Sequence, residues 1–284
     1  MTDRVAIAAK TEAGRDGIAA LLDRPAQALA AFDYDGTLAP IVADPSRAYP
    51  HPRVVSALAS LSRHLGLVAI ITGRPAGLAV ELAGLAGAPG LDRLMVLGHY
   101  GMERWDAASG KVATVAPPDG LRAVRTALPS LLTSLGAGRA DIEDKGLSVA
   151  VHVRRLDDPA GVFAAVEGPL RELAEEHGLV AEPGRMVVEL RPRGMHKGVA
   201  LRGLVTEARA TVVTFTGDDL GDLTAFAEIE RLRADGFDGV RICSGSAEVR
   251  LLRKQADLVV DGPEGVTRWI EDLVGQLDAR RSTS

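Results

Sequence analysis

Short apolar runs recur along the chain, and most of them end at a glycine, a threonine or an aspartate. Between the runs, apolar residues return at helical spacing, as they do from Val54 to Leu65. Runs of this kind are typical of buried parallel strands, and their alternation with helices predicts an α/β sheet covered by helices on both faces. The runs that we expect to be strands are residues 28–32, 66–71, 94–97, 210–216, 239–243 and 256–260.

The middle of the chain follows a different pattern. Residues 116–120 form a break rich in proline and glycine, and a helical stretch follows over about 121–135. Apolar and polar residues then alternate from Leu147 to Val153, which predicts a half-buried antiparallel strand. A long helix over 159–177 and two strands over 179–182 and 186–190 complete this part, with the turn between the strands at Pro183-Gly184.

These patterns predict two domains. Residues 1–114 and 194–284 are expected to form a Rossmann-like core with a parallel sheet, and residues 115–193 an inserted α+β domain. The polar end segments, residues 1–11 and 278–284, are expected to be loose.

Composition narrows the class of protein. The chain has 284 residues, of which 46% are hydrophobic and 25% charged, and a net charge of −5, so it lacks the basic character of a nucleic-acid-binding protein. No run approaches the ~20 apolar residues of a membrane span, and the first residues do not resemble a signal peptide. The single cysteine, Cys243, cannot form an internal disulfide. These features predict a cytoplasmic protein that binds neither membranes nor nucleic acid.

Two acids follow the first predicted strand. Asp33 and Asp35 stand two residues apart and precede Gly36. One carboxylate of such a pair can attack phosphorus while the other exchanges a proton with the leaving oxygen. The alternative is a capping aspartate followed by a turn aspartate.

Two further segments could bind an anion. Thr72, Gly73 and Arg74 follow a predicted strand and precede a helix, where a hydroxyl and backbone N–H groups can bind phosphate; the alternative is a simple helix cap. Lys197 opens a predicted helix, a position that the helix dipole disfavours for a cation. A role of Lys197 in the function would explain this unfavourable position; the alternative is a lysine in contact with solvent.

The last group contains three acids at one junction between a strand and a helix. Asp218, Asp219 and Asp222 would repel one another without a cation. Oxygen-rich clusters of this kind favour Mg²⁺, whereas capping of the helix would explain only one of the three acids.

Together these four segments resemble the motifs of the haloacid dehalogenase (HAD) phosphatase superfamily in their order and spacing. The insertion lies where that superfamily places its larger cap, of the C2 type. Further segments resemble the trehalose-6-phosphate phosphatases, and the resemblance covers about residues 30–260. The segments are 98–103, 143–154, 188–192 and 217–226. The chain departs from the family pattern at Gly221, Leu223, Thr224 and Val153.

The resemblance implies a Mg²⁺-dependent phosphatase with a catalytic core and a cap that selects the substrate. Asp33 is implied as the nucleophile and Asp35 as the acid and base, while Thr72 and Lys197 bind phosphoryl oxygens. The implied Mg²⁺ ligands are Asp33, the backbone carbonyl of Asp35, Asp218 and Asp219, with Asp222 as a further candidate.

The implied reaction is hydrolysis of trehalose 6-phosphate to trehalose and phosphate through an aspartyl-phosphate, the last step of trehalose biosynthesis. Glu143, Lys145 and Glu189 match sugar-binding positions of the family; the alternative is a solvated charge pair beside a strand. Four residues of the core are further candidates for binding the substrate. They are Gly73, Arg74, His99 and Glu103.

Three other functions remain open. The chain could hydrolyse another sugar or pseudodisaccharide phosphate, act as a phosphomutase, or bind a sugar phosphate without catalysis. The expected partner in each case is a small sugar phosphate, and the expected assembly is a monomer or a weak homo-oligomer.

Overall fold

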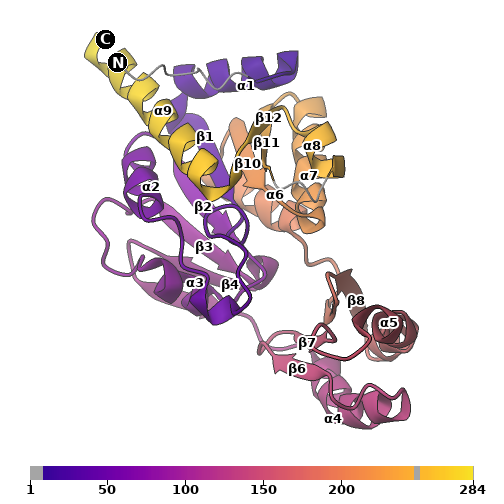
Figure 1. Ribbon diagram of the computed structural model, residues 1–284. Helices are drawn as coiled ribbons and strands as arrows, with labels where there is room; N and C mark the ends of the chain where they lie inside the picture. Colours follow the sequence, from indigo (N-terminus) through magenta and orange to yellow (C-terminus); the bar gives the residue numbers. More distant parts are fainter. Residues whose placement is uncertain (1–8, 246–249, 284) are drawn as a thin grey trace. The chain divides into compact units, whose positions relative to one another are not determined.

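The computed structural model describes residues 9–245 and 250–283, and the chain divides into two compact units (Figure 1). Unit 1 comprises Met1–Ala113 and His196–Ser284, and unit 2 comprises Thr114–Met195. Unit 2 is therefore an insertion between the two segments of unit 1 in chain order. Among the described residues, no helix is both long enough and apolar enough to span a membrane.

Unit 1 contains an eight-stranded sheet with the strand order β12-β11-β10-β1-β2-β3-β4-β5. The strands from β12 to β3 pair in parallel, and β4 pairs antiparallel to β3. This sheet confirms the predicted α/β class with a parallel core. The strands are β1 (Ala28–Phe32), β2 (Leu67–Ile71), β3 (Leu94–Gly98), β4 (Glu103–Asp106), β5 (Lys111–Thr114), β10 (Val212–Gly217), β11 (Asp238–Ser244) and β12 (Leu258–Val260).

Helices cover both faces of this sheet, because the parallel strands are apolar on both sides. Alternate residues of β1 divide between the two apolar cores: Phe32 packs on one face and Leu29 on the other. The helices on the Phe32 face are α1 (Glu12–Asp23), α2 (Val54–Ser62), α3 (Ala76–Ala83) and α9 (Gly262–Thr283). Those on the Leu29 face are α6 (Lys197–Ala208), α7 (Leu223–Ala234) and α8 (Arg250–Gln255).

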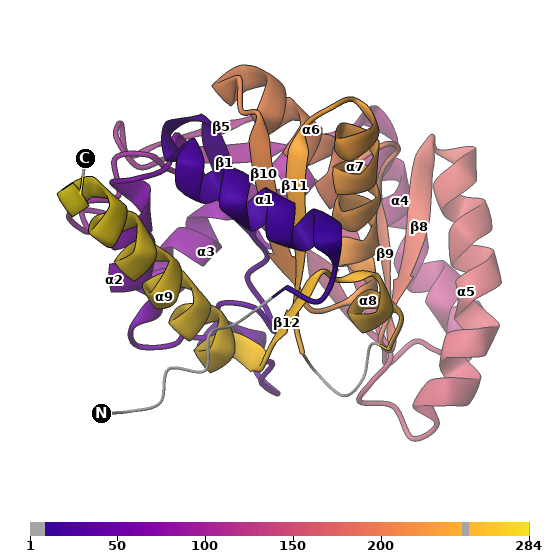
Figure 2. The same cartoon turned by 90° about the horizontal axis from the view of Figure 1, so that it is seen from above.

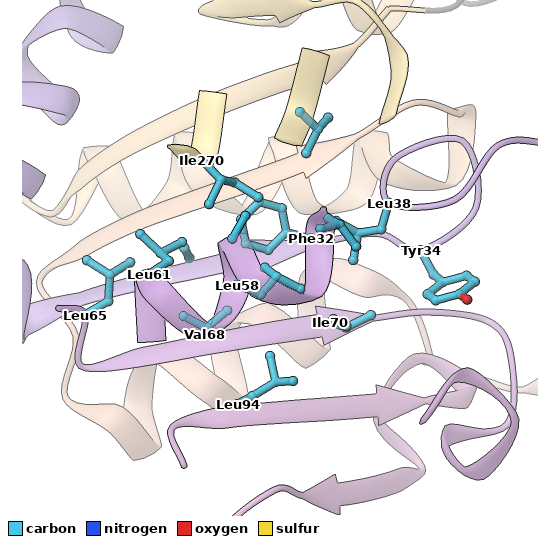
Figure 3. Close-up of a cluster of buried hydrophobic side chains, with 14 of the residues drawn as sticks. Phe32, Tyr34, Leu38, Leu58, Leu61, Leu65, Val68, Ile70, Leu94 and Ile270 are labelled. Carbon is cyan, nitrogen blue, oxygen red and sulfur yellow. The ribbon is translucent and has the colours of Figure 1, made fainter. Parts of the chain in front are cut away.

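The core on the Phe32 face joins distant parts of the chain. The rings of Phe32 and Trp269 lie 6.3 Å apart, so α9 packs on the first strand of the sheet. Figure 3 shows Leu58 and Leu61 of α2 in the same cluster as Phe32 and Ile270. The views in Figures 1 and 2 place α9 beside α2. This packing fixes the end of β1, where Asp33 follows.

The carboxyl-terminal helix corrects one prediction. Residues 278–284 were expected to be loose, but α9 continues to Thr283. Asp278 lies 3.0 Å from the buried imidazole of His64, and Arg280 forms an ion pair with Asp23. These contacts with α1 and with the residues after α2 order the polar end of the helix. At the other end of the chain, the expectation for residues 1–11 lies largely outside the described residues, which begin at residue 9.

A buried carboxylate joins the first helix to the sheet. Asp257 is fully buried and accepts hydrogen bonds from Thr11, Arg233 and Arg241. Burial by itself would raise the pKa of Asp257, but the hydrogen bonds from Arg241, Thr11 and Arg233 lower it to about 2. Asp257 therefore stabilises the fold in its ionised form.

Unit 2 contains a four-stranded antiparallel sheet with the order β6-β7-β9-β8. One face is apolar, and Val149, Val151 and Leu190 pack there in a single core with the two helices. The alternate positions of the same strands include the charged and polar residues Glu143, His152, Glu189 and Arg191. The elements are α4 (Asp119–Ser134), β6 (Asp141–Asp144), β7 (Val149–His152), α5 (Pro159–Glu176), β8 (Leu179–Gly184) and β9 (Val187–Pro192).

The hairpin of unit 2 turns later than the sequence suggests. Pro183 and Gly184 belong to β8, and the turn is formed by Arg185 and Met186, with Met186 at a φ of 57°. β8 lies at the edge of the sheet, where a proline without an N–H group is tolerated. The prediction of a Pro-Gly turn was therefore wrong by two residues.

Candidate active site

Four residues singled out from the sequence lie at the carboxyl ends of the central parallel strands of the unit 1 sheet. Asp33 follows β1, Thr72 follows β2, and Asp218 follows β10. These three strands are adjacent and parallel, so their carboxyl ends lie together, which is where α/β sheets bind ligands. Lys197 is the first residue of α6 and joins the same group.

Lys197 lies between two buried carboxylates. Its Nζ is 2.7 Å from Oδ1 of Asp33 and 2.6 Å from Oδ1 of Asp222. All three side chains are almost fully buried, and so is Asp218. One carboxylate oxygen from each of Asp33, Asp218 and Asp222 lies within 4.8 Å of the others. The sequence therefore brings three acids and one base into a site that water barely reaches.

Burial perturbs the protonation of every member of this cluster. It raises the pKa of Asp33 well above its ordinary value, against the opposing effect of Lys197. Burial, with the charges of Asp222 and Asp219, raises the pKa of Asp218 to about 8. The pKa of Asp222 rises to about 6, again mainly through burial. Burial alone would lower the pKa of Lys197, but the surrounding carboxylates together raise it well above its ordinary value.

The cluster fits a divalent cation. When all four groups are ionised, the three carboxylates exceed the single ammonium by two negative charges. Within the described part of the chain, the buried Oδ1 of Asp218 has no hydrogen-bond partner. A buried, unsatisfied carboxylate oxygen is costly unless an ion or a water molecule contacts it. Carboxylate oxygens at this spacing are the ligands that hard cations such as Mg²⁺ take.

Asp222 has a second role in the loop after β10. Its Oδ2 accepts hydrogen bonds from the backbone N–H groups of Asp218 and Asp219, at 2.8 and 3.0 Å. The side chain of Asp219 in turn accepts from the N–H of Asp222, which completes a capping box around the short helix η4 (Leu220–Asp222). Both oxygens of Asp222 are thus engaged by protein groups, whereas Asp219 is exposed.

Gly36 allows the two halves of the site to approach each other. It has a φ of 72°, a left-handed conformation that favours glycine. A Cβ atom at this position would lie 2.0 Å from Oδ2 of Asp218. Its carbonyl accepts a hydrogen bond from Ser244 at the end of β11. The loop after β1 therefore approaches the loop after β10 at a position where only glycine fits.

Asp35 is held apart from the buried cluster. Its two carboxylate oxygens each accept a hydrogen bond of 2.7 Å from Arg74, one from Nε and one from Nη2. The Asp35 side chain is 41% exposed. Of the two acids that follow β1, Asp35 is therefore the more accessible and Asp33 is the buried one.

The segment after β2 is supported by an unusual backbone. His99 and Tyr100, in the short helix η3 (His99–Gly101), have φ angles of 46° and 55°, which are left-handed and uncommon for such residues. Their N–H groups donate to the carbonyls of Arg74 and Thr72, both at 3.0 Å. A Cβ atom on Gly73 would lie 2.6 Å from the Tyr100 hydroxyl. The strained turn thus positions the candidate anion-binding loop.

Glu103 contacts the start of α3, the helix that follows this loop, and His99 lies near Glu103. Glu103 accepts a hydrogen bond of 2.7 Å from the N–H of Ala76, in the first turn of α3. His99 is buried, and its Nε2 lies 3.9 Å from Glu103. In this arrangement Glu103 satisfies a free N–H group at the helix start and supports the loop from behind.

The polar face of the unit 2 sheet carries the other candidate residues. Glu189 is buried and accepts a hydrogen bond of 2.5 Å from Ser148, with Lys145 at 3.5 Å. Glu143 lies 2.8 Å from the imidazole of His152 and is half exposed. Residues 143, 150 and 189 align across three strands, so both glutamates share one face. This face therefore offers charged hydrogen-bond donors and acceptors.

The comparisons with known proteins agree with one another. Residues 31–255 match the family model described as trehalose-phosphatase. The chain is 30% identical over 257 residues to the trehalose-6-phosphate phosphatase of Escherichia coli, covering 89% of each chain. This chain belongs to the trehalose-phosphatase family. As a member of that family it is a phosphatase of the HAD superfamily.

Solved structures of low sequence identity share the fold of this family member. The carboxyl-terminal domain of the trehalose-6-phosphate phosphatase of Candida albicans superposes with a TM-score of 0.73 at 21% identity, covering 91% of this chain and 95% of that one. A haloacid dehalogenase-like hydrolase from Bacteroides thetaiotaomicron gives 0.61 at 17% identity, covering 86% and 98%. Mycobacterial relatives are longer proteins, and the chain spans 61% of their length.

Two of the residues that depart from the expected family pattern, Thr224 and Gly221, contact each other. Thr224 donates a hydrogen bond of 2.9 Å to the carbonyl of Gly221. The same hydroxyl accepts a hydrogen bond from the N–H of Gly198, beside Lys197. In this family member a neutral side chain therefore joins the loop after β10 to the start of α6.

Sequence reasoning missed several contacts around these residues. It named Asp222 as a possible further metal ligand and did not anticipate the capping box that Asp219 and Asp222 form. It offered no signal for the pairing of Arg74 with Asp35 or of Ser148 with Glu189. Such pairings depend on which strands become neighbours and on side-chain rotamers, which a single sequence does not specify.

Proposed function

We propose that this chain is a Mg²⁺-dependent phosphatase for trehalose 6-phosphate, hydrolysing it to trehalose and phosphate. The observation that carries the chemistry is the buried arrangement of Asp33, Lys197, Asp218 and Asp222 at the ends of β1 and β10. Membership of the trehalose-phosphatase family supports the substrate. Unit 2 is proposed as the cap that selects it.

The proposed reaction has two steps on Asp33. In the first, an oxygen of Asp33 forms a bond to phosphorus while the bond from phosphorus to the sugar oxygen breaks, and Asp35 gives its proton to that oxygen. In the second, water attacks phosphorus and gives a proton to Asp35, and the bond to Asp33 breaks. Thr72 and Lys197 are proposed to bind the phosphoryl oxygens, because phosphoryl transfer depends mainly on positioning and charge.

The structure supports different roles for the two acids. Asp33 lies against Lys197 at 2.7 Å, so the ammonium can orient it and offset its charge as phosphate approaches. Asp35 is more exposed and can reach both a leaving oxygen and a water molecule. Asp222 is proposed to hold Lys197 in place.

Asp33, Asp218 and the backbone carbonyl of Asp35 are the proposed holders of Mg²⁺, with Asp219 close enough in the loop to assist. When bound, the ion would offset the negative charges of the nucleophile and the phosphate. Because both oxygens of Asp222 contact protein groups, we assign it a supporting role behind the ligands.

Glu143, Lys145 and Glu189 are proposed to bind the sugar. Ser148 and Lys145 contact Glu189, which fixes one acceptor on the polar face. A disaccharide presents many hydroxyl groups, and polar groups left unpaired by the wrong substrate would lower its rate.

A substrate panel tests the proposal. Phosphate release is measured with Mg²⁺ from trehalose 6-phosphate, sucrose 6-phosphate, glucose 6-phosphate and an aryl phosphate, each with an EDTA control. The expected result is that trehalose 6-phosphate is hydrolysed faster than the other esters and that EDTA abolishes this turnover. Turnover of the aryl phosphate alone would leave the phosphatase chemistry and remove the substrate assignment. Turnover unaffected by EDTA would remove the proposed metal.

A further inference from the structure

Arg74 donates two parallel hydrogen bonds to Asp35, the more exposed of the two acids after β1. Its Nε donates to Oδ2 of Asp35 and its Nη2 donates to Oδ1, each at 2.7 Å. A guanidinium and a carboxylate in this bidentate arrangement fix each other's plane as well as their distance. The orientation of the Asp35 carboxyl group is therefore set by Arg74.

Arg74 is itself anchored on its other sides. Its Nη1 donates to the carbonyl of Pro45 at 2.9 Å, and the guanidinium carbon lies 5.5 Å from the centre of the Tyr34 ring. The Tyr34 hydroxyl donates to the carbonyl of Ala48, in the same loop as Pro45. The Arg74 side chain is only 12% exposed, against 41% for Asp35. Arg74 is thus the fixed member of the pair, and Asp35 is the member that a substrate can reach.

The bidentate arrangement has a chemical consequence for proton transfer. A carboxyl group that gives a proton to a leaving oxygen must direct an O–H bond at that oxygen. Here each oxygen of Asp35 accepts a hydrogen bond from one N–H group of Arg74, so the transferable proton occupies either a second lone pair of one oxygen or the place of one opened hydrogen bond. In both cases the bond to the other oxygen can remain and keep the carboxyl group in place while the protonated oxygen faces the phosphate ester.

We propose that Arg74 is the positioning residue for Asp35: it retains one carboxylate oxygen while the other exchanges the proton, first with the leaving oxygen and then with water. This inference rests on the proposed function, because it gives Asp35 the role of acid and base. It predicts that Arg74 contributes to turnover through Asp35, and that it contributes little through contact with the substrate.

A double-mutant cycle tests this coupling. Wild type, R74A, D35N and R74A/D35N are compared on trehalose 6-phosphate. General acid and base catalysis contributes ~10²–10⁴-fold, so R74A is expected to lower kcat by about 100-fold with KM changed less than about 3-fold. In the D35N background, the same substitution should lower kcat by less than about 3-fold, because residues that act as a unit are not additive.

An aryl phosphate separates the two chemical steps. A phenolate leaves without a proton, so R74A should still transfer the phosphoryl group to Asp33 at nearly the wild-type rate. Hydrolysis of the aspartyl-phosphate still requires Asp35 as a base. We therefore expect a burst of about one phenol per active site, followed by slow turnover. R74K should not restore kcat, because an ammonium cannot form the two parallel bonds.

Y34F is the matched control. It removes the hydroxyl that holds Ala48, in the loop that also contacts Arg74, without touching Asp35. Its kcat should remain within about 3-fold of wild type, since the loss is one ordinary hydrogen bond. An equal loss of kcat in Y34F and R74A would show that Arg74 merely supports the loop, and would overturn the inference.

Two other results would overturn the positioning role. A rise in KM at unchanged kcat in R74A would make Arg74 a substrate contact. A loss of kcat in the D35N background as large as that in wild type would show that Arg74 acts independently of Asp35. Both results leave the proposed function intact. A wild-type chain that hydrolyses no phosphate ester would overturn the proposed function, and the inference with it.

Discussion

Asp222 and Lys197 form a buried ion pair, with 2.6 Å between Oδ1 and Nζ. The second oxygen of the same carboxylate accepts hydrogen bonds from the N–H groups of Asp218 and Asp219. One side chain therefore connects the start of α6 to the loop after β10. Asp222 thus positions both Lys197 and Asp218, a candidate metal ligand. Asp222 itself is buried and, in our proposal, does not contact the substrate.

D222N tests this connection. The amide keeps the size of the side chain but loses the charge that faces Lys197, and breaking a buried ion pair costs about 3–5 kcal/mol. We expect the free energy of unfolding to fall by about 3 kcal/mol and kcat to fall at least about 100-fold, because Lys197 loses its orientation. Denaturant unfolding and steady-state kinetics measure the two effects. D235N, which alters an exposed ion pair with Arg202, is the control. Wild-type stability and kcat in D222N would contradict the assignment.

G36A should disable the site without unfolding the chain. The added methyl group would meet Asp218 at 2.0 Å, so the carboxylate has to move. Gly87 has a similar φ of 74° and open space around it, so G87A carries the same backbone strain of about 1 kcal/mol and no clash. We expect stabilisation of the fold by Mg²⁺, measured as a shift in Tm, to persist in G87A and to be lost in G36A. Equal shifts in both variants would show that Asp218 tolerates the displacement.

Substitutions in unit 2 should distinguish the sugar from the phosphate. E143A and K145A remove charged groups from the polar face, and each lost contact to a hydroxyl is worth about 1–3 kcal/mol. We expect kcat/KM to fall by about 10- to 100-fold on trehalose 6-phosphate and by less than about 3-fold on an aryl phosphate. E167A, which removes an ion pair with Arg171 on α5, should change neither. Equal losses on both substrates would indicate that Glu143 and Lys145 support the fold.

Asp257 gives the stability of unit 1 a defined dependence on pH. Its pKa is about 2 in the folded chain and close to 4 in an unfolded one. A lowered pKa stabilises the fold at pH values above the unfolded pKa, and this contribution is lost as the pH falls from about 4 toward 2. The contribution at pH 7 is on the order of 2 kcal/mol.

D257N provides the comparison for this prediction. The difference in the free energy of unfolding between wild type and D257N should be constant from about pH 7 to about pH 5 and should shrink below about pH 4. D16N, on the exposed surface of α1, controls for the loss of one acid. A difference that stays constant down to about pH 2 would assign the stabilisation to packing.

The buried strands of unit 1 could be predicted from sequence because each is an apolar run that ends in a polar residue. Of the four edge strands, β12 and β8 could be predicted in the same way, but β5 and β6 could not. β5 and β6 are exposed along their whole length, so their residues carry no hydrophobic pattern. Each is a strand only because a neighbour supplies hydrogen bonds. Pro183 gave the opposite error, since a residue typical of turns lies at the edge of a sheet.

The candidate site, like the fold, could be predicted from the sequence only in part. Asp33, Thr72, Lys197 and Asp218 could be proposed because the ends of strands and the start of a helix mark their positions in the sequence. The partners of these residues could not, because the pairing of Arg74 with Asp35 joins side chains from two loops and depends on their rotamers. Asp222 lies between the two cases: its capping-box spacing was visible, but its contact with Lys197 spans 25 positions of the chain.

The pairing of β1 with β10 has a consequence for biosynthesis. Ala28 pairs with Val212, so the whole of unit 2 is translated between these two neighbouring strands. At roughly 5–20 residues per second, the interval is on the order of 10–40 s. Until β10 emerges from the ribosome, one edge of the apolar β1 has no native partner and is open to pairing with another nascent chain. The demand on chaperones should therefore last until β10 is made, and a rearranged gene that translates β10 before β1 would give β1 its partner as soon as β1 emerges.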